Sequence, residues 1–325
     1  MAPGLSLGFN TCFAVKRWPE PERWMAIVRE DLGLRHCQVS LDLFEPGLDL
    51  SIVMSAARSV ARAAQRSDVV LHSSFTGLAG YSSNLLLHPD PEARQAARHW
   101  FERAIDLTAE MGAAGTGGFL GAFSASEATN AGTREQRFAE LAEAMAGLSE
   151  HASRAGLSFL LFENMAVPRE FGHSIPEAHR LEELGSGGPV PWIICLDLGH
   201  PCALSTGTPS DDPLHWLDES WQHTPVIQIQ QANRSGDFHW PFTPERNSEG
   251  LLSPQAVVES LVAAGTDTSL FFEIIHPAEH PDDAVLDDLR QSVECWRAAL
   301  AAEDVMVPDM VESHVDGAEG VDHVG

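Results

Sequence analysis

The stretch LSFLLFE (residues 157–163) decides the fold, because it is an apolar run that ends in an acid and the chain repeats this pattern. Apolar runs of this length, separated by helix-length segments, are typical of the buried strands of a parallel sheet. When such a sheet closes into a barrel, the C-terminal ends of its strands converge on one face. The later copies of the pattern are WIICLD (192–197), VIQ (226–228) and LFFE (270–273). Three acids and an amide are therefore expected to meet at one face.

The rest of the chain alternates strand-like and helix-like segments in the same way. Further strands are expected near residues 5–9, 37–41, 68–72 and 115–120, and helices near 20–31, 51–66, 90–111, 134–155, 176–184, 212–221, 253–264 and 282–300. Eight strand–helix pairs predict an α/β fold of the (β/α)8 TIM barrel type over residues 1–302. An open doubly wound sheet is the structural alternative, but no GxGxxG sequence follows a predicted strand.

The C-terminal segment differs from the predicted barrel in composition. Residues 303–325 contain seven acids and neither lysine nor arginine. A segment with so much charge and so little apolar content cannot bury enough surface to offset the entropy of ordering. We predict a disordered acidic C-terminal tail over these residues.

The whole chain is strongly acidic, with 47 Asp and Glu residues against 20 Lys and Arg residues and a formal net charge of −27. Such a field repels a phosphate backbone, which proteins bind through clusters of Lys and Arg. We therefore expect no nucleic-acid partner. Lys16 is the only lysine, so Schiff-base chemistry and a pyridoxal phosphate linkage, which both need a lysine amine, are disfavoured.

Signals for export or membrane insertion are missing from the sequence. The first residues, MAPGLSLGFN, lack the charged and apolar regions of a signal peptide, and no run of about 18 apolar residues occurs. Five cysteines are scattered without CxxC spacing, as expected for free thiols in a reducing compartment. The sequence predicts a cytoplasmic protein with no membrane partner.

The four residues that end the repeated runs form the predicted metal site: Glu163, Asp197, Gln228 and Glu273. Three converging carboxylates would repel one another and resist ionisation without a cation. Hard oxygen donors suit Mg²⁺ or Mn²⁺, whereas a zinc site more often recruits His or Cys. The alternative is that each acid only caps the helix after its strand, where the helix dipole favours negative charge. One divalent ion, Mn²⁺ or Mg²⁺, is the expected cofactor.

Four further polar residues are candidates for substrate binding: His200, Arg234, His72 and Asn10. His200 follows Asp197 by three residues and could hydrogen-bond a substrate hydroxyl or bind a second ion. Arg234 follows the seventh predicted strand, where a guanidinium can fork onto a substrate oxygen. His72 and Asn10 are expected to end the third and first strands. The alternatives are a packed loop histidine, a surface ion pair for Arg234, and polar groups that satisfy loop backbone.

Two other sets of polar residues leave their role open. Asp237 and His239 form a potential metal pair in a stretch that is equally compatible with a solvated loop. His276, shortly after Glu273, is expected to support the site or the fold rather than to be a direct ligand. No GxSxG sequence is present, and none of the cysteines lies in a recognisable nucleophile motif. Nucleophilic hydrolysis therefore has little support.

A set of residues in a fixed order resembles the xylose isomerase-like barrel superfamily, most of all its ketose 3-epimerases of the tagatose epimerase kind and their sugar isomerase relatives. The resemblance covers roughly residues 5–300. It rests on Glu163, Asp197-x-x-His200, Gln228-x-x-x-Ala232-Asn233-Arg234 and Glu273. The resemblance implies a metal-dependent isomerase or epimerase that acts on a small sugar substrate. An unphosphorylated monosaccharide is expected, because no phosphate-cradling glycine loop precedes a helix and bases near the mouth are few.

The resemblance also implies a role for each matching residue. Glu163 and Glu273 would be metal ligands that act as the acid/base pair on opposite faces of the substrate, and Asp197 would be a ligand only. His200 and Arg234 would hold substrate hydroxyls. The metal would polarise the sugar carbonyl and stabilise an enediolate while protons move between carbon atoms. Return of the proton to the neighbouring carbon gives isomerisation, and return to the opposite face gives epimerisation.

The chain departs from the family pattern at two places. The family usually has His where this chain has Gln228, which changes the strength of that ligand and the metal preference. The second Glu that epimerases carry shortly after the fifth strand has no clean match, although Arg169 and Glu170 stand near that place. The role of that second Glu is therefore not transferred.

Three rival functions use the same barrel. A three-zinc endonuclease is disfavoured by the net charge and by the absence of histidines after the fourth and seventh predicted strands. A lyase remains open, such as the large subunit of a C-glycoside deglycosidase, which would have a small β-rich partner subunit. A non-catalytic sugar-binding barrel is disfavoured by the presence of both Glu163 and Glu273. A homo-oligomer is compatible with the resemblance.

Overall fold

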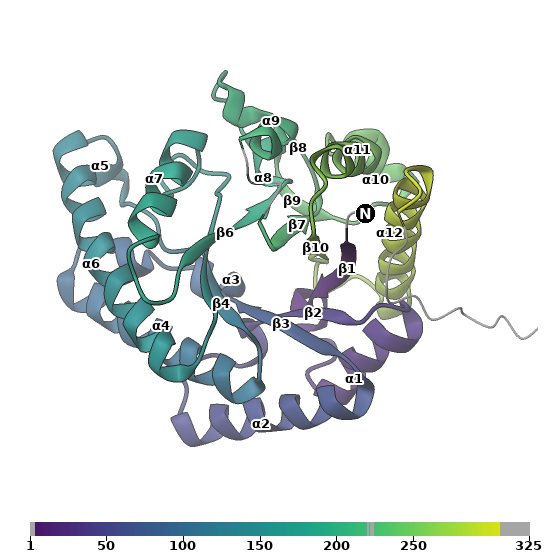
Figure 1. Cartoon of the computed structure of the whole chain (residues 1–325), viewed down its shortest axis with the longest axis horizontal. Helices are drawn as coiled ribbons and strands as arrows, with labels where there is room; N and C mark the ends of the chain where they lie inside the picture. The colour runs from purple at the N-terminus through teal and green to yellow at the C-terminus, as the bar shows by residue number, and fades with distance from the viewer. Residues whose placement is uncertain (1–3, 220, 222–223, 306–325) are drawn as a thin grey trace, which may run out of the picture.

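The computed structural model describes residues 4–219, 221 and 224–305, and it shows eight parallel strands closed into a barrel (Figure 1). The order around the barrel is β1-β10-β7-β6-β5-β4-β3-β2. The predicted TIM barrel is thereby confirmed. The strands are β1 (Leu5–Asn10), β2 (His36–Ser40), β3 (Val70–Phe75), β4 (Gly115–Gly118), β5 (Phe159–Glu163), β6 (Trp192–Asp197), β7 (Val226–Ile229) and β10 (Thr268–Phe272).

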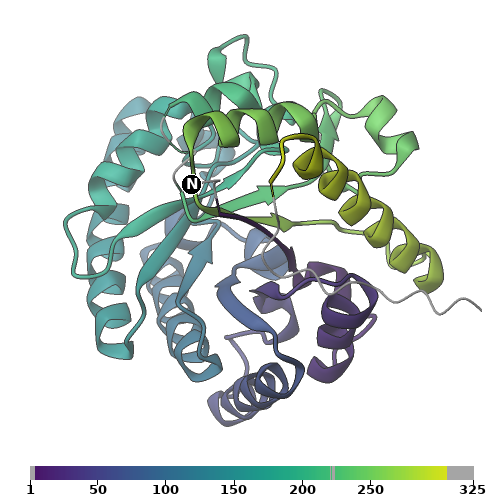
Figure 2. The ribbon, with the colours of Figure 1, turned by 45° about the vertical axis from the view of Figure 1, so that its right-hand side comes forward.

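Helices surround the strands as an outer ring (Figures 1 and 2). Several of the longer ones begin at polar caps whose side chains accept a backbone N–H, as Asp90, Asn130 and Ser253 do. The α-helices are α1 (Pro21–Ala26), α2 (Leu50–Ser67), α3 (Gly77–Tyr81), α4 (Pro91–Met111), α5 (Ala125–Ala128), α6 (Ala131–Ala155), α7 (Ile175–Gly185), α8 (His200–Ala203), α9 (Pro213–Asp218), α10 (Pro244–Glu249), α11 (Pro254–Ala264) and α12 (Asp282–Ala302). Short 3-10 and π turns, η1 (Thr11–Ala14), η2 (Ile27–Asp31), η3 (Leu41–Leu43), η4 (Leu85–Leu87) and η5 (Pro209–Asp211), complete the connections.

The barrel interior is filled by a small apolar cluster formed by Phe75, Leu161, Cys195, Val226 and Phe271. Side chains alternate between the two faces of a strand. The residue two positions after each of the last four members therefore also points inward, nearer the C-terminal end of the strand. On β5, β6 and the end of β10 those residues are acids, and on β7 the residue is Gln228. Strand alternation thus accounts for why the acids gather at the mouth.

Strand β4 is short and rich in glycine because its neighbours approach closely. Gly117 has a φ of 145°, and a Cβ there would lie 2.0 Å from the carbonyl oxygen of Leu161 on β5. Any side chain at this position would therefore force the two strands apart. The predicted strand at 115–120 is confirmed with an earlier end.

A two-stranded hairpin follows β7 and was not expected as regular structure. It consists of β8 (Gln231–Asn233) and β9 (Gly236–Trp240), which pair antiparallel. The hairpin places Asp237 and His239 on a regular strand, where the sequence left a solvated loop open. It therefore brings two more titratable side chains toward the barrel mouth.

The described part of the chain ends just beyond α12. Val305 is buried against the core cluster, three residues past the predicted barrel boundary. The rest of the predicted tail, residues 306–325, lies outside the described residues. Among the described residues, none of the helices combines the length and apolar content needed to cross a membrane.

Candidate metal centre and active site

Three buried carboxylates stand at the C-terminal ends of neighbouring strands. Glu163 ends β5, Asp197 ends β6, and Glu273 directly follows β10. Their exposed fractions are 5%, 0% and 5%. The strand ends thus place these residues as the sequence predicted, while their roles as ligands and catalysts stay predictions.

Asn164 and Asp197 form the local framework between β5 and β6. The Asn164 side chain accepts the backbone N–H of Asp197 at 2.7 Å and donates to its carbonyl oxygen at 2.8 Å. Oδ1 of Asp197 accepts the N–H groups of Gly199 and His200 at 2.6 and 3.1 Å. Oδ2 of Asp197 is buried and has no hydrogen-bond partner in the described part of the chain. A buried carboxylate oxygen without a partner is costly, and a divalent cation bound by these carboxylates would remove that cost.

His200 is fixed by the same framework. Its Nδ1 lies 2.6 Å from the carbonyl oxygen of Asn164, so this nitrogen is the donor and the ring orientation is set. Its Nε2 faces Asp237 at 3.2 Å and Asp197 at 3.8 Å. The structure therefore brings His200 to the carboxylates and to the wall of the cavity.

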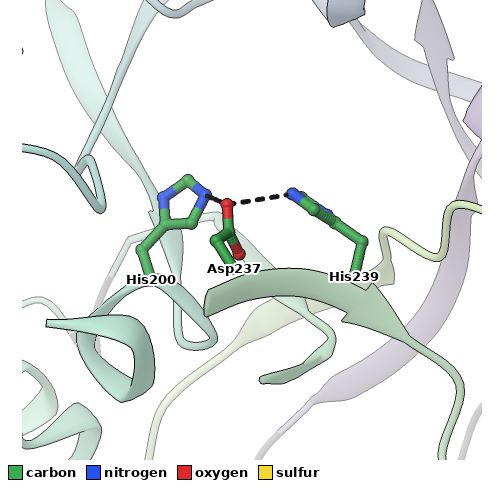
Figure 3. A group of neighbouring side chains, drawn as sticks. All are labelled: His200, Asp237 and His239. Carbon is green, nitrogen blue, oxygen red and sulfur yellow. Dashed lines mark ion pairs between the residues drawn. The ribbon is translucent and has the colours of Figure 1, made fainter. Parts of the chain in front are cut away.

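Asp237 lies between two histidines, His200 and His239 (Figure 3). The Nε2 of His239 is 3.3 Å from Oδ2 of Asp237, and its Nδ1 is 3.1 Å from the backbone oxygen of Glu273. His239 has a φ of 49°, a left-handed conformation that is uncommon for residues other than glycine. Such strain is often stored at functional sites. The hairpin thus adds His239 to the three carboxylates as a nitrogen donor.

Gln230 hydrogen-bonds to both Asp237 and His239 of the hairpin. Its amide nitrogen donates to Oδ1 of Asp237 at 2.6 Å, and its oxygen accepts the N–H of His239 at 2.8 Å. The Gln230 side chain needs the space beside Gly199, where a Cβ would lie 2.4 Å from the Gln230 carboxamide carbon. Gly199 therefore serves close packing against Gln230 as well as the turn.

Three groups of acids and histidines in this region have one ligand atom each within 4.8 Å of one another. These groups are Glu163, Asp197 and His200; Asp197, His239 and Glu273; and His200, Asp237 and His239. Together with the orphaned oxygen of Asp197, this donor set fits a divalent metal ion. Carboxylate oxygens favour Mg²⁺ or Mn²⁺, and an imidazole nitrogen widens the range toward later transition metals.

Burial and mutual repulsion shift the pKa values of the carboxyl groups upward. Burial raises the pKa of Glu163 well above its usual value, with Glu273 and Asp197 adding to the shift against the opposing effect of His200. Burial raises the pKa of Glu273 to about 8, against the opposing effect of His239. A carboxyl group with the pKa of Glu273 can hold or release a proton near neutral pH, which suits an acid/base role.

The histidines respond to the same acids in the opposite sense. Burial alone would lower the pKa of His239, but Asp237, Glu273 and Asp197 raise it to about 10. The pKa of His200 is raised well above its usual value by Asp197, Asp237 and Glu163, again against burial. The mouth thus carries an excess of negative potential that favours any cation.

A single cavity collects these residues. Its polar part contains Glu163, His200, Asp237, His239 and Glu273, and the other lining residues are Cys12, Asp42, Phe75, Thr76, Gly77, Leu78, Tyr81, Phe119, Met165 and Ile275. Most of these other residues come from the β1–β4 half of the barrel, and they include the apolar side chains of Phe75, Leu78 and Phe119 and a further acid, Asp42. Neither arginine nor lysine is among these described lining residues.

Gln228 lies inside the barrel, in register with Asp197 on β6. Its amide nitrogen donates to Oε1 of Gln38 at 2.8 Å, and its own Oε1 is buried with no partner among the described residues. That oxygen is free to bind an ion, so Gln228 stays a predicted ligand. His239 is a second candidate for the position that the family gives to a histidine.

Asn10 ends β1, as predicted, and contacts a catalytic candidate directly. Its amide nitrogen donates to Oε1 of Glu273 at 3.1 Å and to Oε1 of Gln38 at 2.9 Å. Its Oδ1 accepts the N–H of Cys12 at 3.0 Å. These contacts orient Glu273, so Asn10 is placed as a positioning residue rather than at the cavity wall.

Arg234 is not among the described residues that line the cavity, and its role in substrate binding stays a prediction. Its guanidinium donates to the carbonyl oxygens of Pro201, Cys202 and Leu204 at 2.7, 3.1 and 2.5 Å and to that of Asp211 at 2.7 Å. Four carbonyl oxygens of one loop use most of its donors. Arg234 therefore holds the loop after β6 in place.

The expectation that His72 ends the third strand is corrected. Strand β3 continues to Phe75, so His72 lies in the first half of the strand instead of at its C-terminal end. Its ring packs 5.6 Å from Phe159 and 5.2 Å from Phe271, measured between ring centroids. Ser73, Ser74 and Phe75 carry no sequence signal that separates a strand from a loop. His72 therefore belongs to the barrel interior at the end remote from the acids.

Glu170 and Tyr81 lie near the mouth and were not assigned a role from the sequence. Glu170 is buried, and burial raises its pKa to about 7. Burial, with Glu170 adding, raises the pKa of Tyr81 above its usual value. Their side chains interact and join the loop after β5 to α3. Spacing in the sequence alone does not reveal this contact.

Comparison with families of known proteins identifies the family of this chain. A family profile described as xylose isomerase-like TIM barrel matches residues 30–299. The chain belongs to the xylose isomerase-like TIM barrel family. The resemblance inferred from the order of acids and His200 is thereby confirmed, and the named relatives of this family member are sugar isomerases and epimerases.

Three individual relatives illustrate the similarity. D-erythrulose 1-phosphate 3-epimerase of Brucella abortus (strain 2308) is 28% identical over 296 residues, which cover 90% of this chain and 95% of that protein. The structure of a putative xylose isomerase of Rhodospirillum rubrum ATCC 11170 is 34% identical, with a TM-score of 0.85 and coverage of 91% and 99%. D-psicose 3-epimerase of Clostridium cellulolyticum H10 with D-tagatose shares the fold at 12% identity, with a TM-score of 0.65 and coverage of 91% and 99%.

Proposed function

We propose that this protein is a divalent-metal-dependent sugar isomerase or epimerase that acts on a small unphosphorylated monosaccharide. The observation that carries the proposal is the pair of buried carboxyl groups, Glu163 and Glu273, that face one cavity beside the orphaned oxygen of Asp197. The raised pKa of each Glu suits a group that takes and returns a carbon-bound proton.

Different residues would hold the metal, transfer the proton and bind the substrate. Glu163, Asp197, Glu273 and His239 would hold Mn²⁺ or Mg²⁺, with Gln228 as a further candidate ligand. When bound, the ion would supply polarisation of the sugar carbonyl and stabilisation of the negative charge that develops beside it. One Glu removes the proton from carbon and the same or the other Glu returns it. His200, fixed by Asn164, donates a hydrogen bond to a sugar oxygen.

The charge of the cavity supports an unphosphorylated substrate. The described lining residues include no arginine or lysine, and Arg234 is occupied by backbone oxygens. The first amide groups of α3 face the cavity region but already donate to the Asp42 carboxylate, at 2.8 Å from Leu78 and 2.7 Å from Ala79. A phosphate would therefore enter an acidic site, and the first amide groups of α3 would already be bonded to Asp42. The Brucella relative named for a 1-phosphate makes this a point to test directly.

Proton NMR in D₂O tests the function. The protein, freed of bound metal and supplied with Mg²⁺ or Mn²⁺, is incubated with aldoses, ketoses, a C-glycoside, D-erythrulose and D-erythrulose 1-phosphate. Deuterium at C1 or C2 of a free sugar would identify an isomerase, and deuterium at C3 with inversion would identify an epimerase. The Glu163→Gln variant, matched in size, is the control and should incorporate none.

The other outcomes have defined meanings. Exchange only in the 1-phosphate would overturn the unphosphorylated substrate but keep the proton transfer. Release of the aglycone from the C-glycoside, with no exchange in free sugars, would indicate the lyase alternative. Sugar binding without any solvent deuterium in the ligand would indicate a binding barrel.

A further inference from the structure

A second cluster of metal-binding side chains lies between the barrel mouth and α12. His276 and His280 belong to the loop that joins β10 to α12, and Asp288 lies on the second turn of α12. Oδ2 of Asp288 is 3.1 Å from Nε2 of His276 and 3.4 Å from Nε2 of His280. One ligand atom from each residue lies within 4.8 Å of the others.

We infer that His276, His280 and Asp288 form a second metal site that binds Zn²⁺ or a similar late transition ion and clamps the β10–α12 loop to α12. The inference goes beyond the proposed sugar chemistry, because none of these residues lines the cavity.

The distances fit a tetrahedral ion. Ligand bonds of about 2.0–2.1 Å in a tetrahedron place neighbouring ligand atoms about 3.3 Å apart. The two measured separations, 3.1 and 3.4 Å, bracket that value. Nε2 of His280 makes no hydrogen bond among the described residues despite this short distance. Its orientation therefore fits a shared ion better than a direct hydrogen bond to Asp288.

The donor types set the metal. Two imidazole nitrogens and one carboxylate oxygen match the three-ligand zinc sites of proteins, which leave a fourth position for water. Mg²⁺ prefers oxygen ligands and keeps several waters, so two histidines disfavour it.

Arg17 prepares the loop for this role. Its guanidinium donates to the carbonyl oxygens of His280 at 2.7 Å and Pro277 at 2.6 Å, and to Asp282 at 2.5 Å. These bonds fix the backbone between the two histidines before any ion binds. The positive charge of Arg17 opposes a cation nearby, but the carboxylate of Asp282 offsets it. A site that is already ordered loses less entropy on binding.

The clamp would act on the edge of the catalytic cavity. Ile275, which precedes His276, lines the cavity and donates its N–H to the carbonyl oxygen of His239 at 3.0 Å. An ion at the second site would therefore stiffen the segment that follows Glu273. We expect it to stabilise the fold without entering the proton transfer.

The test counts Zn²⁺ ions per full-length chain after saturation and dialysis, using elemental analysis. His280→Ala and Asp288→Asn should each retain one equivalent fewer than the wild type. His99→Ala, a histidine whose side chain is 64% exposed and lies outside the cluster, is the matched control and should retain the wild-type number. With Co²⁺ as the probe, the variants should lose part of the visible absorption that four-coordinate Co²⁺ gives. His280→Ala should keep its sugar exchange in Mn²⁺.

The outcomes separate this inference from the proposed function. Side chains of His280 and Asp288 are 38% and 22% exposed, so both variants should fold, and circular dichroism checks this. Wild-type zinc content in both folded variants would overturn the second site. Asp197→Asn should remove a different equivalent. If it removes none, Asp197 is refuted as a ligand at the proposed active site, while the result for His280 stands by itself.

Discussion

His200 at the barrel mouth and His72 near the opposite end of the interior show how one residue type behaves in two environments. Carboxylates of Asp197, Asp237 and Glu163 raise the pKa of His200 well above its usual value. Burial, with His36 adding, lowers the pKa of His72 to about 4. Both rings are inside the same barrel, so depth alone does not set the charge of a histidine.

The difference separates the parts of the barrel that do chemistry from those that support it. The mouth brings mutually repelling acids together, and an oxygen of Asp197 there has no hydrogen-bond partner among the residues that the structure describes. The region around His72 contains the rings of Phe159 and Phe271 and keeps its histidine neutral. A site that collects unfavourable charges is where a metal and a proton transfer are expected.

The largest effect is expected from the two Glu residues of the mouth. Glu163→Gln and Glu273→Gln should each lower turnover by at least roughly 10²-fold, because each removes a positioned proton carrier. The measurement is the initial rate of solvent deuterium incorporation. His72→Phe is the control at the other end of the barrel and should keep the wild-type rate. Near-wild-type rates in both Gln variants would refute the acid/base roles.

The metal itself is tested next. Chelation should abolish activity, and Mn²⁺ or Mg²⁺ should restore it better than Zn²⁺. Asp197→Asn should weaken Mn²⁺ binding by roughly 10-fold or more, because it removes a buried negative charge while keeping an oxygen to accept the N–H groups of Gly199 and His200. Calorimetric titration with Mn²⁺ gives the affinity. Unchanged affinity would mean that the partnerless oxygen of Asp197 does not face the ion.

The neutral ligand gives a smaller and more selective effect. His239→Ala should lower Mn²⁺ affinity about tenfold, because the ion must displace the proton that the neighbouring acids hold on His239, and this ligand therefore contributes less than a buried carboxylate. Gln228→His should instead shift the metal preference toward Zn²⁺, since imidazole is the softer donor. Activity ratios in Mn²⁺ and Zn²⁺ measure the shift. An unchanged metal profile for Gln228→His would show that His239, rather than Gln228, completes the set.

The sequence predicted the elements that depend on short-range periodicity. An apolar run that ends in an acid fixes both the strand and the direction of its last side chain, because alternation carries the inward face from Leu161 to Glu163 and from Cys195 to Asp197. The barrel and the place of the three acids followed from that rule, whereas His200 was found by its place three residues after Asp197. The resemblance then added the expected roles.

The remaining site residues depend on contacts that spacing does not encode. Asp237 and His239 reach the mouth because β8 and β9 pair and Gln230 binds both. The guanidinium of Arg234 contacts the carbonyl oxygens of the loop after β6, and this contact depends on the tertiary structure. Local propensities for loop or strand at positions 234–240 predict neither the hairpin contacts nor those of Arg234.

The last prediction concerns His72 and the pH dependence of stability. A histidine with a pKa of about 4 in the folded state and 6.5 as its ordinary value stays neutral in the fold while it takes up a proton on unfolding. Its contribution is therefore present above about pH 6.5 and is lost as the pH falls toward 4. Between pH 7 and pH 5 the loss amounts to about 2 kcal/mol of unfolding free energy.

His72→Phe keeps a ring beside Phe159 and Phe271 but cannot take up a proton, so it should lose about 2 kcal/mol less than the wild type over this range. Urea unfolding at both pH values measures the difference, and any change common to both pH values cancels. Equal losses in the two proteins would mean that His72 is solvated enough to titrate normally, and the contrast with His200 would then rest on the acids alone.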